Sequence, residues 1–161
     1  MTAPTAPRKL QDLLDLQAIR DIEARYCEAI DEYDLDEVLS LFTEDCVTDY
    51  GPGRGGAEVG TDAMRRRWET QPAGSGSKST HHQLGQIRIE LAGDQADCVS
   101  YCIADHVRRN GERITFRFQY RDRLRRTAAG WRISRRKLLF TVVDGNLGPE
   151  REWLVRKDPR A

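Results

Sequence analysis

Seven polar or ionisable side chains stand where the surrounding pattern is apolar, and all three histidines of the chain are among them. They are Tyr26, Asp31, Tyr50, His81, His82, Asp105 and His106. A buried polar group costs free energy unless it is paired, so side chains of this kind from separate segments predict a shared, lined pocket. A histidine ring exchanges protons near neutral pH, and a neighbouring carboxylate can orient it. Proton transfer, or the binding of a small molecule, is therefore the chemistry that these residues could support.

The overall charge points to no partner, because 26 Lys and Arg residues balance 26 Asp and Glu residues. The distribution is uneven: residues 11–49 hold 13 acidic and two basic side chains, whereas residues 108–137 hold 12 basic and two acidic ones. The two segments could pack together or face a neighbouring subunit, or the basic one could bind nucleic acid. Because no aromatic residues interleave with the arginines on their face, a solvated or intersubunit face is favoured and no nucleic-acid partner is expected.

The length of 161 residues predicts one domain with a sizeable core. We expect residues 1–9 to be a flexible arm, residues 10–148 to be the domain and residues 149–161 to be a charged tail. The four cysteines make no metal-finger spacing, so buried free thiols in a reduced, cytoplasmic protein are expected. No run resembles a signal peptide or a membrane span.

Three helices are predicted in the first half of the chain. They cover residues 10–30, 35–42 and 61–70, with a short strand over 46–50. The first has apolar residues at helical spacing over about six turns. Asp34 and Glu37 form the pattern of a capping box for the second, and Thr61 can cap the third. The Gly-rich segment 51–60 lacks the ending of a phosphate-binding loop, and residues 72–79 are expected to be a flexible loop.

Four strands are predicted in the second half. They cover residues 81–91, 96–109, 113–126 and 131–143. Asn110 and Gly111 between the middle two are a strong hairpin signal. Phe116, Phe118 and Tyr120 alternate with polar residues, as in a half-buried strand. Helices followed by an antiparallel meander predict an α+β fold, in which a curved sheet around a helix leaves a conical pocket.

This order of elements resembles the SnoaL-like branch of the nuclear-transport-factor-2-like superfamily. The resemblance rests on the helix IRDIEARYCEAIDEYDLDEVLSLFTEDCVTDY, the later segment STHHQLGQ and the closing segment GWRISRRK. It implies a cone-shaped α+β barrel with N-terminal helices on a curved, mainly antiparallel sheet. The most similar patterns are those of scytalone dehydratases, bile-acid 7α-dehydratases and hexachlorocyclohexane dehydrochlorinases. The fold itself hosts many reactions and also proteins that are not enzymes.

The resemblance implies a catalytic pair of Asp31 and His82, in which the carboxylate orients the ring. A Gln, Gln86, stands four residues after His82, where these enzymes often have Asn. Strand alternation sends His81 and His82 to opposite faces, so both cannot line one pocket without a bulge. Periodicity favours His81 as the residue that faces the core, because Ile87 and Ile89 share its side, whereas the resemblance favours His82.

Four further pocket residues follow from the resemblance. Tyr26 and Tyr50 match pocket tyrosines of the dehydratases and are expected to take part in catalysis by hydrogen bonding. Asp105 matches an acidic residue of the bile-acid dehydratases and Arg136 an arginine of the dehydrochlorinases, so both are expected to bind substrate. His106 is expected to point away from the pocket and to be structural.

The function that these residues favour is a cofactor-independent lyase or isomerase, most specifically a dehydratase. Its substrate would be a hydrophobic cyclic molecule such as a polyketide or a steroid. The alternative is a non-catalytic binding or association module, such as the small subunit of an oxygenase. No metal and no membrane partner is expected. Exposed sheet edges and the arginine-rich face predict a homo-oligomer, either a dimer or a trimer.

Overall fold

The computed structural model describes residues 10–70, 77–145 and 152–155. The arm expected at residues 1–9 and most of the expected tail lie outside these ranges. Three helices precede most of the sheet: α1 (Leu10–Glu32), α2 (Leu35–Ser40) and α3 (Thr61–Thr70). A single 3-10 turn, η1 (Pro52–Arg54), lies between α2 and α3. The cap predicted for α2 is confirmed, since the backbone N–H of Glu37 donates to the Asp34 carboxylate at 3.0 Å.

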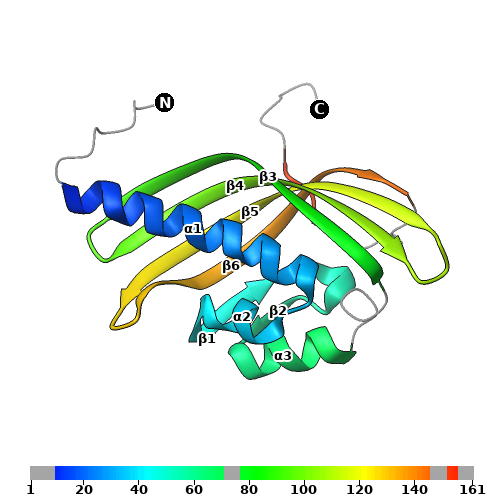
Figure 1. The fold of residues 1–161 in the computed structure, drawn as a ribbon, viewed down its shortest axis with the longest axis horizontal. Helices are drawn as coiled ribbons and strands as arrows, with labels where there is room; N and C mark the ends of the chain where they lie inside the picture. The colour runs from blue at the N-terminus through cyan, green and yellow to red at the C-terminus, as the bar shows by residue number, and fades with distance from the viewer. Residues whose placement is uncertain (1–9, 71–76, 146–151, 156–161) are drawn as a thin grey trace.

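Six strands form one mixed sheet in the order β2-β1-β6-β5-β4-β3. They are β1 (Phe42–Asp49), β2 (Ala57–Val59), β3 (Ser77–Ala92), β4 (Gln95–Arg108), β5 (Arg113–Thr127) and β6 (Gly130–Asp144). Among these six strands only the β1–β6 pair is parallel. The sheet is curved and open, and α1 lies across one of its faces, while α2 and α3 gather with β1 and β2 at one end (Figure 1). The predicted α+β architecture, with helices packed on a curved sheet, is therefore confirmed.

Small side chains line the face of β4 that is turned toward α1. The face of β4 under the helix carries Cys98, Ser100, Cys102 and Ala104, all of them buried. The Ser100 hydroxyl donates to Glu23 of the helix at 3.2 Å. Large residues fill the rest of the same sheet face where the helix does not reach, such as Phe116 and Phe118 on β5.

Three predicted boundaries are wrong. Phe42 begins β1 instead of ending the second helix. The Gly-rich segment contains β2, which pairs antiparallel with β1 through Val59 opposite Val47. Residues 77–79 belong to β3 rather than to a loop, because their backbone continues the ladder with β4. In each case pairing with another strand decided the structure over local composition.

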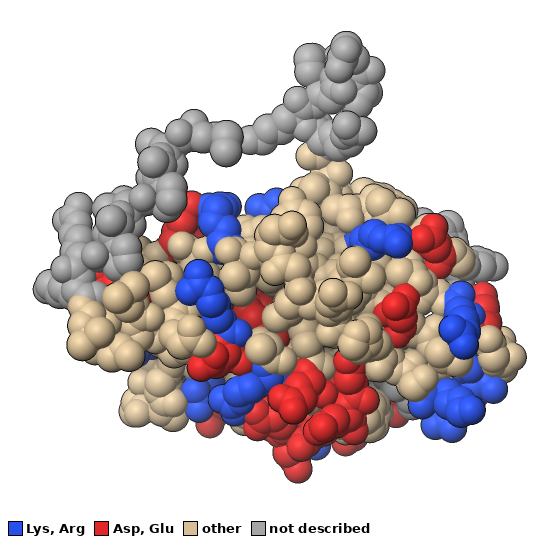
Figure 2. Space-filling model, turned by 45° about the horizontal axis from the view of Figure 1, so that its top comes forward, with Lys and Arg blue, Asp and Glu red and all other residues tan. Residues whose placement is uncertain are grey.

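The acidic and basic segments of the sequence pack against each other. Arg126 of β5 donates two hydrogen bonds to Asp15 of α1, and Arg125 forms an ion pair with Asp45 of β1. Acidic and basic side chains are mixed over the face seen in Figure 2, with an acidic group at its lower edge. Much of the charge asymmetry along the chain is therefore satisfied within the fold.

Asp15 gives the fold an acid-sensitive contact. Hydrogen bonds from Arg126, and then from Trp131 and Gln11, outweigh burial and lower the pKa of Asp15 from 3.8 to about 2. A carboxylate whose folded pKa is lowered stabilises the fold above its unfolded pKa and loses this contribution as pH falls through the folded value. We expect an Asp15→Asn variant to be less stable than the wild type at pH 6, with the difference shrinking between about pH 4 and pH 2. Urea unfolding midpoints across this range would measure it, and a difference that stays constant with pH would contradict the assignment.

All four cysteines are buried and free, as predicted. No helix in the described part of the chain is long and apolar enough to cross a membrane.

Candidate active site

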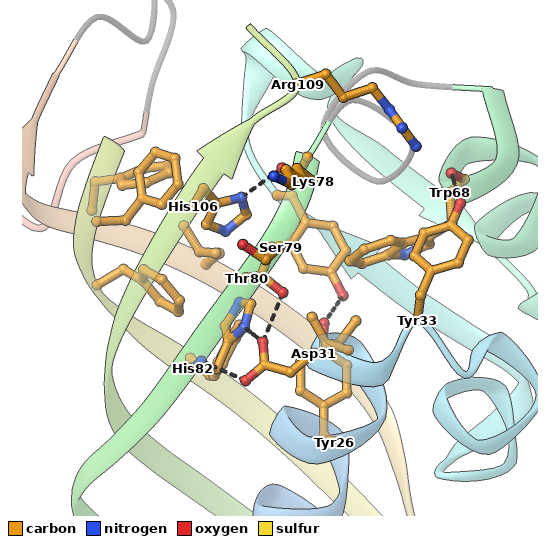
Figure 3. A pocket seen from close by; sticks show the side chains of 18 residues that line it. Tyr26, Asp31, Tyr33, Trp68, Lys78, Ser79, Thr80, His82, His106 and Arg109 are labelled. Atoms are coloured by element: carbon orange, nitrogen blue, oxygen red, sulfur yellow. Dashed lines mark hydrogen bonds and ion pairs between the residues drawn. The ribbon is translucent and has the colours of Figure 1, made fainter. Parts of the chain in front are cut away.

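A cavity of about 350 Å³ opens between the C-terminal end of α1, α3 and the sheet. Its apolar wall comes from β5 and β6 and consists of Phe116, Phe118, Tyr120, Leu138 and Phe140. Polar side chains from α1, β3, β4 and the segment just after β1 converge on the other side (Figure 3). A concave apolar site with a few convergent polar groups is typical of small-molecule binding.

Asp31 and His82 lie in direct contact at this cavity. His82 Nδ1 and Asp31 Oδ1 are 2.7 Å apart, and the side chain of His82 is 7% exposed. The backbone N–H of His82 donates to Asp31 Oδ2 at 2.7 Å, and the hydroxyl of Thr80 donates to Oδ1 at 2.7 Å. An ionised carboxylate can only accept hydrogen bonds, so Nδ1 is the donor and Nε2 of the neutral ring keeps a free lone pair.

These contacts keep Asp31 ionised. Partial burial acts to raise the pKa of Asp31, but the hydrogen bonds from His82 and Thr80 outweigh it and leave the pKa below its ordinary value of 3.8. The carboxylate is therefore negatively charged at neutral pH, where it can orient the imidazole ring and stabilise an imidazolium ion.

A bulge in β3 explains how His82 faces the cavity. Leu84 pairs with Cys102 of β4 and Ile87 pairs with Ser100, so β3 uses one residue more than its partner. The extra residue reverses the alternation, which places His82 on the same face as Ile87 and Ile89. The side chain of His81 is 72% exposed, and its Nδ1 lies 3.9 Å from Asp31 Oδ2, beyond hydrogen-bond distance. Simple alternation along the sequence had favoured His81.

Tyr26 and Tyr50 meet inside the cavity with their hydroxyl oxygens 3.0 Å apart. Complete burial raises the pKa of both phenols, and the smaller opposing effect of Arg136 does not cancel it. Both hydroxyls stay protonated at neutral pH. One of them can donate to the other while the second donates into the cavity.

Arg136 does not line the cavity, contrary to the expectation that it contacts substrate. Its side chain is fully buried and bound to the carboxylates of Glu23 and Asp122. The guanidinium carbon lies 4.0 Å from the ring centre of Tyr26 and 4.1 Å from that of Tyr120. Arg136 therefore supports the two tyrosines from behind by cation–π contact.

The expectations for Asp105 and His106 are reversed in the structure. Asp105 is exposed on the face of β4 that points away from the cavity, where it accepts a hydrogen bond from Thr115. His106 lines the cavity, with its ring centre 5.6 Å from that of His82 and its Nδ1 3.2 Å from the hydroxyl of Ser77. The reason is that the inner face of β4 is the one with small residues under α1, and His106 continues that face.

Several lining residues were not predicted from the sequence. Tyr33 follows α1 with a left-handed backbone, φ 58°, and its hydroxyl donates to the carbonyl of Trp68 at 3.1 Å. The sequence does not reveal a positive φ at a residue other than glycine, so this position could be found only in the structure. Thr80, which fixes Asp31, sits two residues before His82 on the same strand face and could have been found by alternation. Within the described ranges, no cluster of three His, Cys, Asp or Glu side chains could hold a metal ion.

A model of the SnoaL-like domain matches residues 11–137 of the chain. The chain belongs to the SnoaL-like family. A search of the curated proteins finds no match. The SnoaL-like match covers strands β1 to β5, the first half of β6 and both members of the Asp31–His82 pair.

Solved structures similar to this SnoaL-like protein share its architecture. A candidate scytalone dehydratase from Novosphingobium aromaticivorans is 23% identical, with a TM-score of 0.81 over 91% of this chain and 97% of that one. A candidate aromatic ring hydroxylase from the same organism is 30% identical, with a TM-score of 0.76 over 83% and 94%. The hexachlorocyclohexane dehydrochlorinase LinA-type3 from Novosphingobium barchaimii is 13% identical, with a TM-score of 0.76 over 91% and 99%. Dehydratase and dehydrochlorinase structures thus stand among the neighbours of this SnoaL-like protein.

Proposed function

We propose that this protein is a cofactor-independent lyase or isomerase that acts on a hydrophobic cyclic small molecule, and that dehydration is its reaction. The observation that carries the proposal is the 2.7 Å contact between Asp31 and His82 at the wall of a cavity whose opposite wall is largely aromatic. A purely structural role would not require a nearly buried His82 ring that lines a cavity and keeps the lone pair of Nε2 for a ligand. The pairing is that of a general base with its orienting carboxylate.

The geometry supports an elimination with balanced proton transfers. His82 Nε2 takes a proton from the carbon next to a carbonyl, and the electron pair of the broken C–H bond moves to form an enolate. The enolate then re-forms the carbonyl as a carbon–carbon double bond forms and the C–O bond to the hydroxyl group breaks. The leaving hydroxide takes a proton from the His82 imidazolium, which yields water and restores the neutral ring.

Other residues of the cavity have supporting roles in this scheme. The Tyr26–Tyr50 pair would donate a hydrogen bond to the developing enolate oxygen, as preorganised donors do. Asp31 would stabilise the imidazolium. His106, whose ring lies beside that of His82, is a second proton carrier within reach of a bound ligand. Returning the proton to a different carbon would give isomerisation instead.

The similar structures support the elimination class. The first is described as a candidate scytalone dehydratase and another as a hexachlorocyclohexane dehydrochlorinase. Both names denote removal of a small acid or water from a cyclic compound.

A second function has an observation of its own. The relative with 30% identity is described as a candidate aromatic ring hydroxylase. In that case the chain would be a non-catalytic association module of an oxygenase. Such a module needs neither an Asp–His contact nor an open cavity, so the site geometry favours the enzyme.

A panel assay tests the proposal directly. The purified chain is incubated in D2O with cyclic β-hydroxy ketones, polyketide-like and steroid-like, without added metal or cofactor. We expect enone formation by ultraviolet absorbance, or exchange of the proton next to the carbonyl by NMR, for at least one compound. Compounds that bind in the cavity but undergo neither elimination nor exchange would contradict the enzyme assignment and favour the association module.

A further inference from the structure

The connection between α1 and α2 consists of two residues, Tyr33 and Asp34, and its geometry is unusual for a tyrosine. The backbone N–H of Asp34 donates to the carbonyl of Ala29 at 2.8 Å, and that of Tyr33 donates to the carbonyl of Ile30 at 3.2 Å. This pair of hydrogen bonds is the Schellman motif, in which the residue after the helix takes a left-handed backbone and is most often glycine. Tyr33 takes that backbone, with φ 58°.

A tyrosine at this position costs free energy that a glycine would not cost. A side chain in the left-handed region crowds its own backbone, whereas glycine has no Cβ. The other eight residues with positive φ in the described ranges are all glycines. The backbone of the connection therefore does not require Tyr33, so the reason for a tyrosine lies in its side chain. Strained residues of this kind cluster at functional sites.

The side chain of Tyr33 belongs to the wall of the cavity. Its hydroxyl donates to the carbonyl of Trp68, which also lines the cavity, and the two side chains lie together on the helical side (Figure 3). Trp68 in turn meets the ring of Tyr50 edge to face, with the ring centres 6.5 Å apart. Tyr33 is exposed and Tyr50 is buried, so Tyr33 is the outer end of an aromatic row that leads to the Tyr26–Tyr50 pair.

The hydrogen bond to Trp68 does not by itself explain the tyrosine. The last four carbonyls of an α-helix have no partner within the helix, and the carbonyl of Trp68 in α3 is one of them. The Tyr33 hydroxyl satisfies it at the surface, where water can serve the same carbonyl at little cost. The Tyr33 residue stays 44% exposed, which leaves apolar ring surface for a ligand to cover.

We propose that Tyr33 is a ligand-binding residue whose ring packs against a ring of the small molecule bound in the cavity. Tyr33 makes this contact from the helical side, and Phe116, Phe118 and Phe140 form the wall on the sheet side. That the small molecule is the substrate of an elimination rests on the proposed function. The ring contact itself does not, because binding can be measured without turnover.

Three variants at position 33 separate the ring, the hydroxyl and the backbone strain. The probe is N-phenyl-1-naphthylamine, a neutral aromatic dye whose fluorescence rises in an apolar site. We expect the wild type to bind one probe per chain, and Tyr33→Phe, which keeps the ring but loses the hydrogen bond, to match its affinity within about twofold. Tyr33→Ala and Tyr33→Gly should both bind the probe about fivefold more weakly, as expected for the loss of one aromatic contact.

The alanine and glycine variants should differ in stability but not in binding. Tyr33→Gly should unfold at a higher urea concentration than Tyr33→Ala, because glycine has no penalty at positive φ. If Tyr33 served only the fold, probe affinity would follow the same order, and Tyr33→Gly would lose clearly less affinity than Tyr33→Ala. That result would contradict the proposal.

Tyr101→Ala is the matched control. Tyr101 is also 44% exposed, but it lies on the outer face of β4 and outside the cavity lining. We expect this variant to bind the probe as the wild type does. The proposal is overturned if Tyr101→Ala or Tyr33→Phe loses as much affinity as Tyr33→Ala, or if the wild type does not bind the probe. A His82→Gln variant should keep the affinity of the wild type, so failure of the proposed reaction and failure of the ring contact are distinguished.

Discussion

A His82→Gln variant is expected to lose about 10²–10⁴-fold in kcat on any substrate that the wild type eliminates. Glutamine keeps the polarity and much of the volume of the side chain but cannot take up a proton. Asp31→Asn should also lower kcat strongly, because an amide cannot stabilise the imidazolium ion. Since the two groups act as a unit, the kcat of the double variant should be only slightly below that of the less active single variant. Steady-state kinetics of the three variants would check this.

His81→Gln is the matched control for that experiment. It makes the same substitution one residue earlier, at a side chain that is 72% exposed. We expect turnover and stability close to those of the wild type. Equal losses in the His81 and His82 variants, or near-wild-type turnover in the His82 variant, would exclude His82 as the general base.

An Arg136→Met variant is expected to lose about 3–5 kcal/mol of unfolding free energy. Methionine fills similar space but leaves the buried carboxyl groups of Glu23 and Asp122 without their cation. The loss also removes the cation–π support of Tyr26 and Tyr120. Urea unfolding at neutral pH would measure the change.

Glu23→Gln provides a contrasting variant in the same cluster. Burial raises the pKa of Glu23 well above its ordinary value, against the opposing effect of Arg136. Because burial disfavours the charged form of Glu23, an amide of the same shape should replace it at small cost, and we expect a change below about 1 kcal/mol. Arg123→Met, at a side chain that is 60% exposed, should change stability by less than about 0.5 kcal/mol. If Arg136→Met costs no more than Arg123→Met, the buried cation does not stabilise the fold.

The helices, the hairpins and the Asp31–His82 pair could be predicted from the sequence because each depends on local information or on a family pattern. Asp34 caps α2 through a residue three positions away, and Asn110 with Gly111 lies at the turn between β4 and β5. The short strand β2 could not be predicted in this way, since three residues gain their structure only by pairing with β1.

The errors in the site came from reading hydrophobicity without size. On β4 the outward residues Tyr101 and Ile103 are more apolar than the inward ones, and this pattern suggested the wrong face. The smaller residues Ser100 and Cys102 face inward, and Ser100 donates a hydrogen bond to Glu23 of α1. His106 therefore lies on the inner face of β4, and Asp105 lies on the outer face. The sequence could not locate the Arg136 side chain, because its partners Glu23 and Asp122 come together with it only in the folded chain.

The bulge between Leu84 and Ile87 makes the identity of the inward histidine depend on strand pairing rather than on residue type. Ile87 and Ile89 hold the later part of β3 on the inner face, so a strand of the same sequence that paired without this bulge would turn His81 inward and His82 outward. Deleting residue 85 or 86 would instead remove the extra residue and leave His82 on the inner face. The bulge thus decides which of two adjacent histidines faces the cavity, and a one-residue deletion there should preserve that choice.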